Sequence, residues 1–122
     1  MNKILIIEDD ADIRELILES LTDQNYEIIM AASGQNGLDK AQKYLPDAIV
    51  SDIDLPGLNG YEVFKALRQN PVTVMIPFIF LTSLNSETER AYAIKLGVDD
   101  YLNKPCSIKE LKEAIAKALN LK

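Results

Sequence analysis

The chain has 122 residues, of which 48% are hydrophobic and 26% charged, so it is neither a disordered chain nor long enough for two full domains. We therefore expect one domain over residues 1–122. The formal net charge of -6 repels phosphate backbones and anionic membranes, so direct nucleic acid binding by this domain and membrane association are not expected.

Five short apolar segments have the composition of buried strands. The first, at residues 4–7, is apolar at every position, which is typical of a parallel strand covered on both faces. No signal-peptide core precedes it and no apolar stretch approaches membrane-spanning length, so we expect a cytoplasmic protein. Similar runs follow at residues 28–30, 48–50, 78–81 and 98–102.

Segments with helical spacing of apolar residues separate these strands. The first helix is marked by Ile13, Leu16, Ile17 and Leu21, and the last by Leu111, Ile115 and Leu119. Three helices are expected to start at a capping pair: Asp12 with Glu15, Ser86 with Glu89, and Ser107 with Glu110. Gly97 is placed to end the fourth helix in a left-handed C-cap.

The alternation of strands and helices predicts an α/β fold. Right-handed crossovers between parallel strands place helices on both faces of the sheet, and five strands cannot close a (β/α)8 barrel. We therefore expect an open, doubly wound five-stranded parallel sheet with strand order 2-1-3-4-5.

Polar residues follow the carboxyl ends of four of the strands, which is the edge where such sheets bind ligands. They are Glu8, Asp9 and Asp10 after the first strand, Asp52 and Asp54 after the third, Thr82 and Ser83 after the fourth, and Asn103 and Lys104 after the fifth. For Asp10 and Asp12 we favour the simpler interpretation of a helix cap or a solvated loop residue.

The acids at this edge predict a metal site. Asp9 and Asp52 lie on neighbouring strands about 4.8 Å apart. Two carboxylates at about 4 Å repel by roughly 4 kcal/mol at an effective dielectric constant of about 20, and Glu8 adds a third charge. A cation is therefore expected, and all-oxygen ligands favour Mg2+. Lys104 starts about 10 Å from Asp52, a distance that its side chain can largely bridge.

The composition limits the other chemistry available at this edge. The chain has no histidine, which excludes Ser-His-Asp catalysis, histidine metal ligands and a phosphohistidine on this chain. Its lone cysteine, Cys106, permits no intramolecular disulfide and is expected to be a small buried hydrophobic residue. Chemistry must therefore use carboxylates, lysine, serine or threonine.

Four motifs make the chain resemble the response-regulator receiver family, with its flavodoxin-like (CheY-like) (βα)5 fold, along its whole length. They are IIEDD at 6–10, SDIDLPGLNG at 51–60, LTS at 81–83 and GVDDYLNKP at 97–105. The resemblance implies that Asp52 is the phosphoacceptor and that Mg2+ is bound by Asp52, by Asp9, by Glu8 directly or through water, and by the backbone carbonyl of Asp54.

The same resemblance implies how the phosphoryl group is held and detected. Thr82 is expected to hydrogen-bond it, Lys104 to pair with it, and the Lys104-Pro105 peptide to be cis. Tyr101 matches an aromatic switch whose ring turns inward when the Thr82 hydroxyl moves towards phosphate. The alternative for Tyr101, a half-buried residue on an edge strand, stays open.

The implied function is a two-component signalling switch that catalyses only its own phosphorylation and dephosphorylation. The phosphoryl group would come from a phosphohistidine on a sensor histidine kinase or phosphotransfer protein. Output would pass through the face of the fourth helix, fifth strand and fifth helix to a partner, an output domain or a second copy. Two departures from the family pattern are the side chain of Asp54, near the attacking water, and Cys106, where a bulky aromatic is frequent.

Two other functions are considered. The D-x-D of Asp52 and Asp54 imitates haloacid-dehalogenase-like phosphatases, but there it lies on the first strand, whereas Glu8 and Asp9 precede it here. A flavodoxin-like binding module needs a phosphate-binding loop after the first strand, where three acids would repel the ligand.

Overall fold

The structure of the protein is a computed structural model in which residues 1–120 are described. The strands are β1 (Asn2–Ile7), β2 (Tyr26–Ala31), β3 (Ala48–Ser51), β4 (Phe78–Thr82) and β5 (Asp100–Asn103). The helices are α1 (Ala11–Leu21), α2 (Gly34–Tyr44), α3 (Gly60–Arg68), α4 (Glu87–Leu96) and α5 (Ile108–Asn120), and a short 3-10 helix, η1 (Thr22–Gln24), follows α1.

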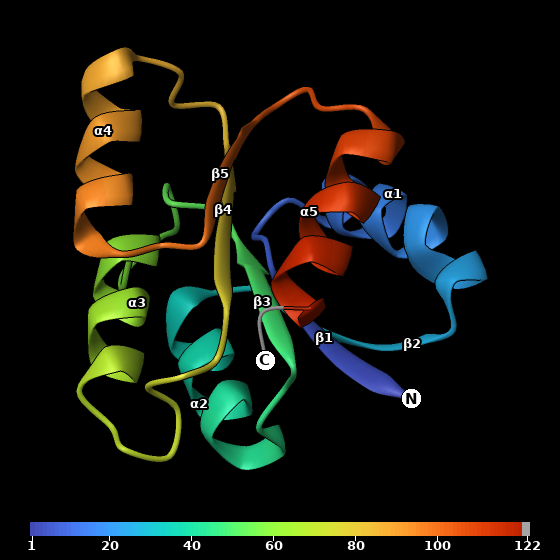
Figure 1. Ribbon diagram of the computed structural model, residues 1–122, viewed down its shortest axis with the longest axis horizontal. Coiled ribbons are helices and arrows are strands. Elements are labelled where there is room, and N and C mark those ends of the chain that lie inside the picture. Colours follow the sequence, from blue (N-terminus) through green and yellow to red (C-terminus); the bar gives the residue numbers. More distant parts are fainter. Residues whose placement is uncertain (121–122) are drawn as a thin grey trace.

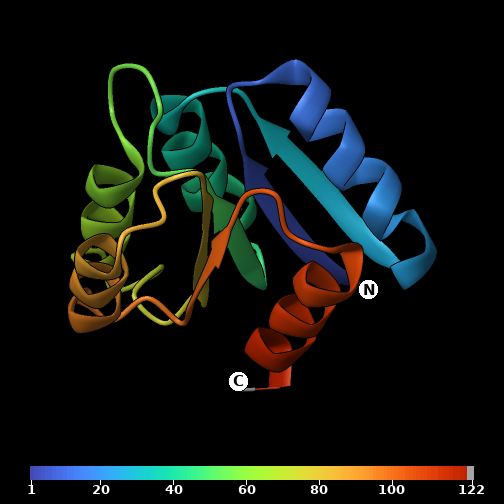
Figure 2. The same cartoon turned by 90° about the horizontal axis from the view of Figure 1, so that it is seen from above.

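The five strands form one parallel sheet with the order β2-β1-β3-β4-β5, which confirms the predicted fold class. Helices α1 and α5 cover one face, and α2, α3 and α4 cover the other (Figures 1 and 2). The chain runs from β1 to β2 on one side and from β3 to β4 on the other, so the strand order reverses between β1 and β3. This is the point at which a ligand site is expected.

Side chains alternate between two cores along the central strands. Leu5 and Ile7 of β1 join the core beneath α2, α3 and α4, whereas Ile4 and Ile6 join the core beneath α1 and α5. All four are almost fully buried. The unbroken apolar run at residues 4–7 is therefore explained by two cores that share one strand.

Two elements differ from the sequence-based expectation. β5 begins at Asp100 rather than at residue 98, because the amide of Val98 donates to Ala93 O and closes the end of α4 instead of joining the sheet. In α1, Ile17 and Leu21 are buried as predicted, but Leu16 is 62% exposed.

The capping predictions are confirmed in part. The N-cap of α1 is Asp10, whose carboxylate accepts from the amides of Asp12 and Ile13, so the prediction that Asp12 caps this helix is wrong. Ser107 and Glu110 form the reciprocal pair. Gly97 ends α4 in the left-handed conformation, with φ 104°.

The N-cap of α4 is half of the predicted pair. Ser86 Oγ accepts from the amide of Glu89, whereas the Glu89 carboxylate accepts from the hydroxyl of Tyr61 on α3.

Among the described residues, no helix combines the length and the apolar composition that a membrane span requires.

Candidate functional site at the carboxyl edge of the sheet

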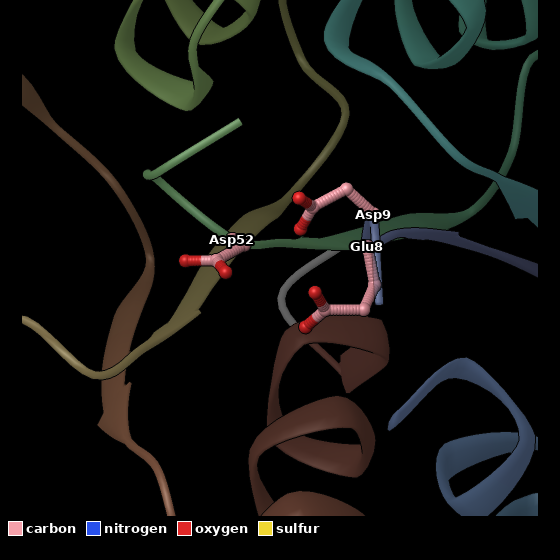
Figure 3. A group of neighbouring side chains, drawn as sticks. All are labelled: Glu8, Asp9 and Asp52. Atoms are coloured by element: carbon pink, nitrogen blue, oxygen red, sulfur yellow. The ribbon is translucent and has the colours of Figure 1, made fainter. Parts of the chain in front are cut away.

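Three acidic side chains meet where β1 and β3 end (Figure 3). Glu8 and Asp9 follow β1, and Asp52 follows β3. One carboxylate oxygen from each lies within 4.8 Å of the others. Glu8 and Asp52 are buried and Asp9 is exposed, so the cluster opens to solvent on the Asp9 side.

The backbone holds these acids in place by extending the sheet past the strand ends. The amide of Glu8 donates to Ala31 O on β2 at 3.0 Å, and the amide of Asp52 donates to Ile7 O on β1 at 3.0 Å. The carboxylates therefore project from a rigid sheet edge and not from a mobile loop.

The carboxylate of Asp52 is held on both of its oxygens. Oδ1 accepts from the amides of Ile53 at 2.7 Å and Asp54 at 3.3 Å. Oδ2 accepts from Lys104 Nζ at 2.9 Å. These donors fix the orientation of a carboxylate in a residue that is only 7% exposed.

Lys104 reaches the acidic cluster from the far edge of the sheet, as predicted. Its amide donates to Thr82 O at 2.8 Å, and its ammonium contacts both Glu8 and Asp52. The Lys104-Pro105 peptide bond is cis, as the resemblance implied. One ammonium thus touches the two buried members of the cluster and leaves Asp9 without this contact.

Burial and charge act in opposite directions on these groups. Burial raises the pKa of Glu8 above its usual range, and the hydrogen bonds from Lys104 and from the amide of Asp10 offset this only in part. Burial alone would lower the pKa of Lys104, but its hydrogen bonds to Glu8 and Asp52, together with their charges, outweigh it and raise the pKa. The lysine is therefore held in its charged form.

The donor set fits a hard divalent cation. The cluster offers carboxylate oxygens from Glu8, Asp9 and Asp52 and no sulfur or imidazole, which is the ligand chemistry that Mg2+ prefers. Asp54 lies in the loop that leaves the site, with its amide directed at Asp52 Oδ1 and its side chain exposed. A role for its backbone carbonyl as a metal ligand stays a prediction.

Thr82 on β4 and Tyr101 on β5 both bind the backbone of Leu84. Thr82 is fully buried, and its hydroxyl oxygen accepts from the amide of Leu84 at 3.3 Å. The Tyr101 ring is only 1% exposed and points inward, and its hydroxyl donates to Leu84 O at 2.5 Å. Tyr101 is therefore a buried residue and not a half-buried one, and its ring packs edge-on against Phe80.

Two contacts near the site were not predicted. Arg14 Nη1 donates to the carbonyls of Glu8 at 2.9 Å and Asp9 at 3.2 Å, which ties α1 to the acidic segment. The sequence offers a signal for the Arg14 contact, because Arg14 is the only basic residue between Lys3 and Lys40. The hydrogen bond between Tyr61 and Glu89 joins α3 to α4 at 2.5 Å and has no equivalent local signal.

An apolar cavity of about 430 Å³ lies beside the site, between α1 and the start of α5. Its lining includes the exposed Leu16 and Ile108, together with Lys104 and Cys106. Cys106 is half-buried and packs against the core beneath α5, so it is less enclosed than expected. Burial raises the pKa of its thiol, which disfavours the reactive thiolate.

Comparison with known proteins gives a consistent result. The family model described as response regulator receiver domain matches residues 4–116. The chain is 38% identical over 113 residues to the alkaline phosphatase synthesis transcriptional regulatory protein PhoP of Bacillus subtilis, an alignment that covers 93% of this chain and 46% of PhoP. It is 36% identical over 111 residues to response regulator ArlR of Staphylococcus aureus, covering 91% of this chain and 49% of ArlR. The chain thus spans about half the length of these curated relatives.

Solved structures lead to the same family. The chemotaxis response regulator CheY4 of Vibrio cholerae superposes with a TM-score of 0.89 at 32% identity, covering 98% of this chain and 99% of CheY4. A response regulator receiver domain protein from Clostridium thermocellum gives a TM-score of 0.91 at 28% identity, covering 99% and 96% of the two chains. Sequence and architecture agree over nearly the whole chain, and it belongs to the response regulator receiver domain family.

Proposed function

We propose that this domain is a phosphorylation-controlled switch in which Asp52 accepts a phosphoryl group in a Mg2+-dependent reaction. The observation that carries the proposal is the meeting of Glu8, Asp9 and Asp52 within 4.8 Å, with Lys104 Nζ 2.9 Å from Asp52 Oδ2. A carboxylate that accepts a phosphoryl group needs positive charge around it, because the incoming oxygens are negative.

Asp52 acts as the nucleophile. The donor is a phosphohistidine on a sensor histidine kinase or phosphotransfer protein, since this chain has no histidine. An oxygen of Asp52 forms a bond to phosphorus as the bond from phosphorus to the donor nitrogen breaks, and the histidine leaves with the electron pair. The amides on Oδ1 limit rotation of the carboxylate during attack.

Mg2+ would be held by Glu8, Asp9, Asp52 and the carbonyl of Asp54. Bound there, it supplies positive charge against the phosphoryl oxygens. Lys104, already in contact with Asp52, would pair with the transferred group. Later hydrolysis of the acyl phosphate by water returns the free carboxylate.

Thr82 transmits the change to the output face. Its hydroxyl accepts from the Leu84 amide and so keeps its own hydrogen for donation to a phosphoryl oxygen. Movement of Thr82 towards the phosphoryl group would disturb its link to Tyr101 through Leu84, and hence the face formed by α4, β5 and α5. A partner, an output domain or a second copy that binds this face differently in the two states would read the signal.

The test is intact mass after treatment with a small phosphodonor and Mg2+, with Asp52→Asn in parallel. We expect an increment of one phosphoryl group in the parent protein and none in the variant. An equal increment in both proteins would refute Asp52 as the acceptor. Repeated turnover of a generic phosphate ester would instead favour the haloacid-dehalogenase-like alternative.

The output route has a separate test by NMR, with and without beryllofluoride as a phosphoryl mimic. We expect chemical shift changes at Tyr101 and along α4 as well as at the acidic cluster. Changes confined to the cluster would exclude this route.

We further propose that the protein acts in the cytoplasm, where sensor kinases present their phosphohistidines.

A further inference from the structure

The first residue of α2 touches the backbone of the loop that follows Asp52. A Cβ atom on Gly34 would lie 1.8 Å from the carbonyl oxygen of Leu58 and 2.8 Å from its carbonyl carbon. Both atoms belong to the main chain, so no side-chain rotation could relieve the overlap. Only glycine allows α2 and this loop to approach so closely.

The loop at residues 53–59 is fixed at both of its ends. At its start, the amides of Ile53 and Asp54 donate to Asp52 Oδ1. At its end, the amide of Gly60 donates back to Ile53 O at 2.9 Å. The tip is open on its outer side, where a Cβ on Gly57 would meet no atom within 4 Å. Contact with Gly34 therefore limits how far the tip can move towards the helix.

Helix α2 cannot easily retreat from this contact. Ser33 caps it by accepting from the amide of Asn36 at 3.1 Å. One turn later the helix presses on β1, where a Cβ on Gly37 would lie 2.4 Å from Cδ1 of Ile7. A methyl group at Gly34 should therefore push the loop and leave the helix in place.

We propose that Gly34 is a positioning residue for metal binding, because it sets the position of the loop that carries the Asp54 carbonyl and the two amides on Asp52. This inference rests on the proposed function, in which that carbonyl is a ligand of Mg2+. Gly34 itself offers no side-chain atom to the metal. Its effect passes from Leu58 along the loop to Asp54.

The experiment compares Gly34→Ala with Gly37→Ala in the full chain. Both changes add one methyl group to α2 at a crowded position, but Gly37 faces the buried side chain of Ile7 on β1 and not the loop. The dissociation constant for Mg2+ is measured by calorimetry, and the amide signals of Ile53 and Asp54 are followed during the titration. We expect Gly34→Ala to weaken Mg2+ binding about tenfold or more, the effect of displacing groups that orient metal ligands. We expect Gly37→Ala to lose thermal stability while its dissociation constant stays within about twofold of the parent value.

The outcomes separate the two hypotheses. If the parent protein binds no Mg2+, the proposed function fails; if folded Gly34→Ala binds Mg2+ as the parent does, only the positioning role is refuted. If Gly34→Ala does not fold, Leu58→Ala decides the question, because it loosens the same part of the loop by removing packing against the core. Weaker Mg2+ binding by Leu58→Ala supports the inference, and unchanged binding overturns it.

Discussion

Replacing Asp9 by asparagine should stabilise the protein without Mg2+ and remove its stabilisation by Mg2+. Charges 4.8 Å apart, the limit for this cluster, repel by about 3.5 kcal/mol at an effective dielectric constant of about 20. Asp9 is exposed, so water reduces that value to roughly 1–2 kcal/mol. Lys104 contacts Glu8 and Asp52 but not Asp9, so its charge offsets the repulsion on Asp9 only in part.

The assay is thermal unfolding of the parent protein and Asp9→Asn, each with and without Mg2+. For a domain of this size, 1–2 kcal/mol corresponds to a rise in Tm of roughly 3–10 °C for the metal-free variant. The parent protein should gain stability from Mg2+, because an ion that binds only the folded state shifts the equilibrium towards it.

Asp12→Asn is the matched control, since it removes an exposed acid from the first turn of α1 outside the cluster. It should slightly lower Tm through the helix dipole and keep the full response to Mg2+. The reasoning is refuted if Asp9→Asn melts at the parent temperature without Mg2+ and still gains the full metal-induced rise.

Substitutions at three further positions, Lys104, Tyr101 and Leu45, test side-chain contacts and backbone strain by urea denaturation without Mg2+. Lys104→Met should lower the free energy of unfolding by about 3 kcal/mol, because two buried acids lose their cation. The control Lys109→Met, at an exposed lysine, should lower it by less than about 0.5 kcal/mol. Equal losses in the two variants would contradict this reasoning. Tyr101→Phe should lower the free energy of unfolding by about 1 kcal/mol, because the hydrogen bond to Leu84 is lost. Tyr101→Ala should lower it by about 3 kcal/mol or more, because the buried ring is lost as well. An unchanged free energy of unfolding in Tyr101→Ala would show that the ring is not held inward. Leu45→Gly should raise the free energy of unfolding by about 0.5 kcal/mol, because Leu45 ends α2 with φ 49°, a left-handed conformation that glycine adopts without strain. Leu45→Ala keeps the Cβ and should show no such gain.

The fold and the acidic cluster were predictable because both follow from periodicity and topology. An apolar run such as residues 4–7 has no polar face, so it needs cover on both sides and implies two helical layers. Once β1 and β3 are neighbours, the residues after them must meet at one edge. Asp9 and Asp52 then come together whatever the details of packing.

The errors arose where local and tertiary hydrogen bonds compete. Val98 has strand composition, yet its amide closes the end of α4, which a left-handed Gly97 makes geometrically accessible. Asp10 and Asp12 carry the same side chain two positions apart, and only the path of the chain leaving β1 selects Asp10 as the cap. Glu89 likewise has the spacing of a capping pair but binds Tyr61, because α3 brings a hydroxyl within reach.

Leu84 connects Thr82 to two residues of β5, Tyr101 and Asn103, through its backbone. Its amide donates to Thr82 Oγ1 at 3.3 Å, and its carbonyl accepts from Tyr101 at 2.5 Å and from Asn103 Nδ2 at 3.0 Å. A Thr82 hydroxyl that moves towards a phosphoryl group must therefore either lose the Leu84 amide or carry Leu84 with it. In the second case the carbonyl of Leu84 moves too, and both donors from β5 have to follow or find other partners. Because Leu84 also lies in the segment that leads into α4, the coupling proposed between Asp52 and α4 would need no large movement of the sheet.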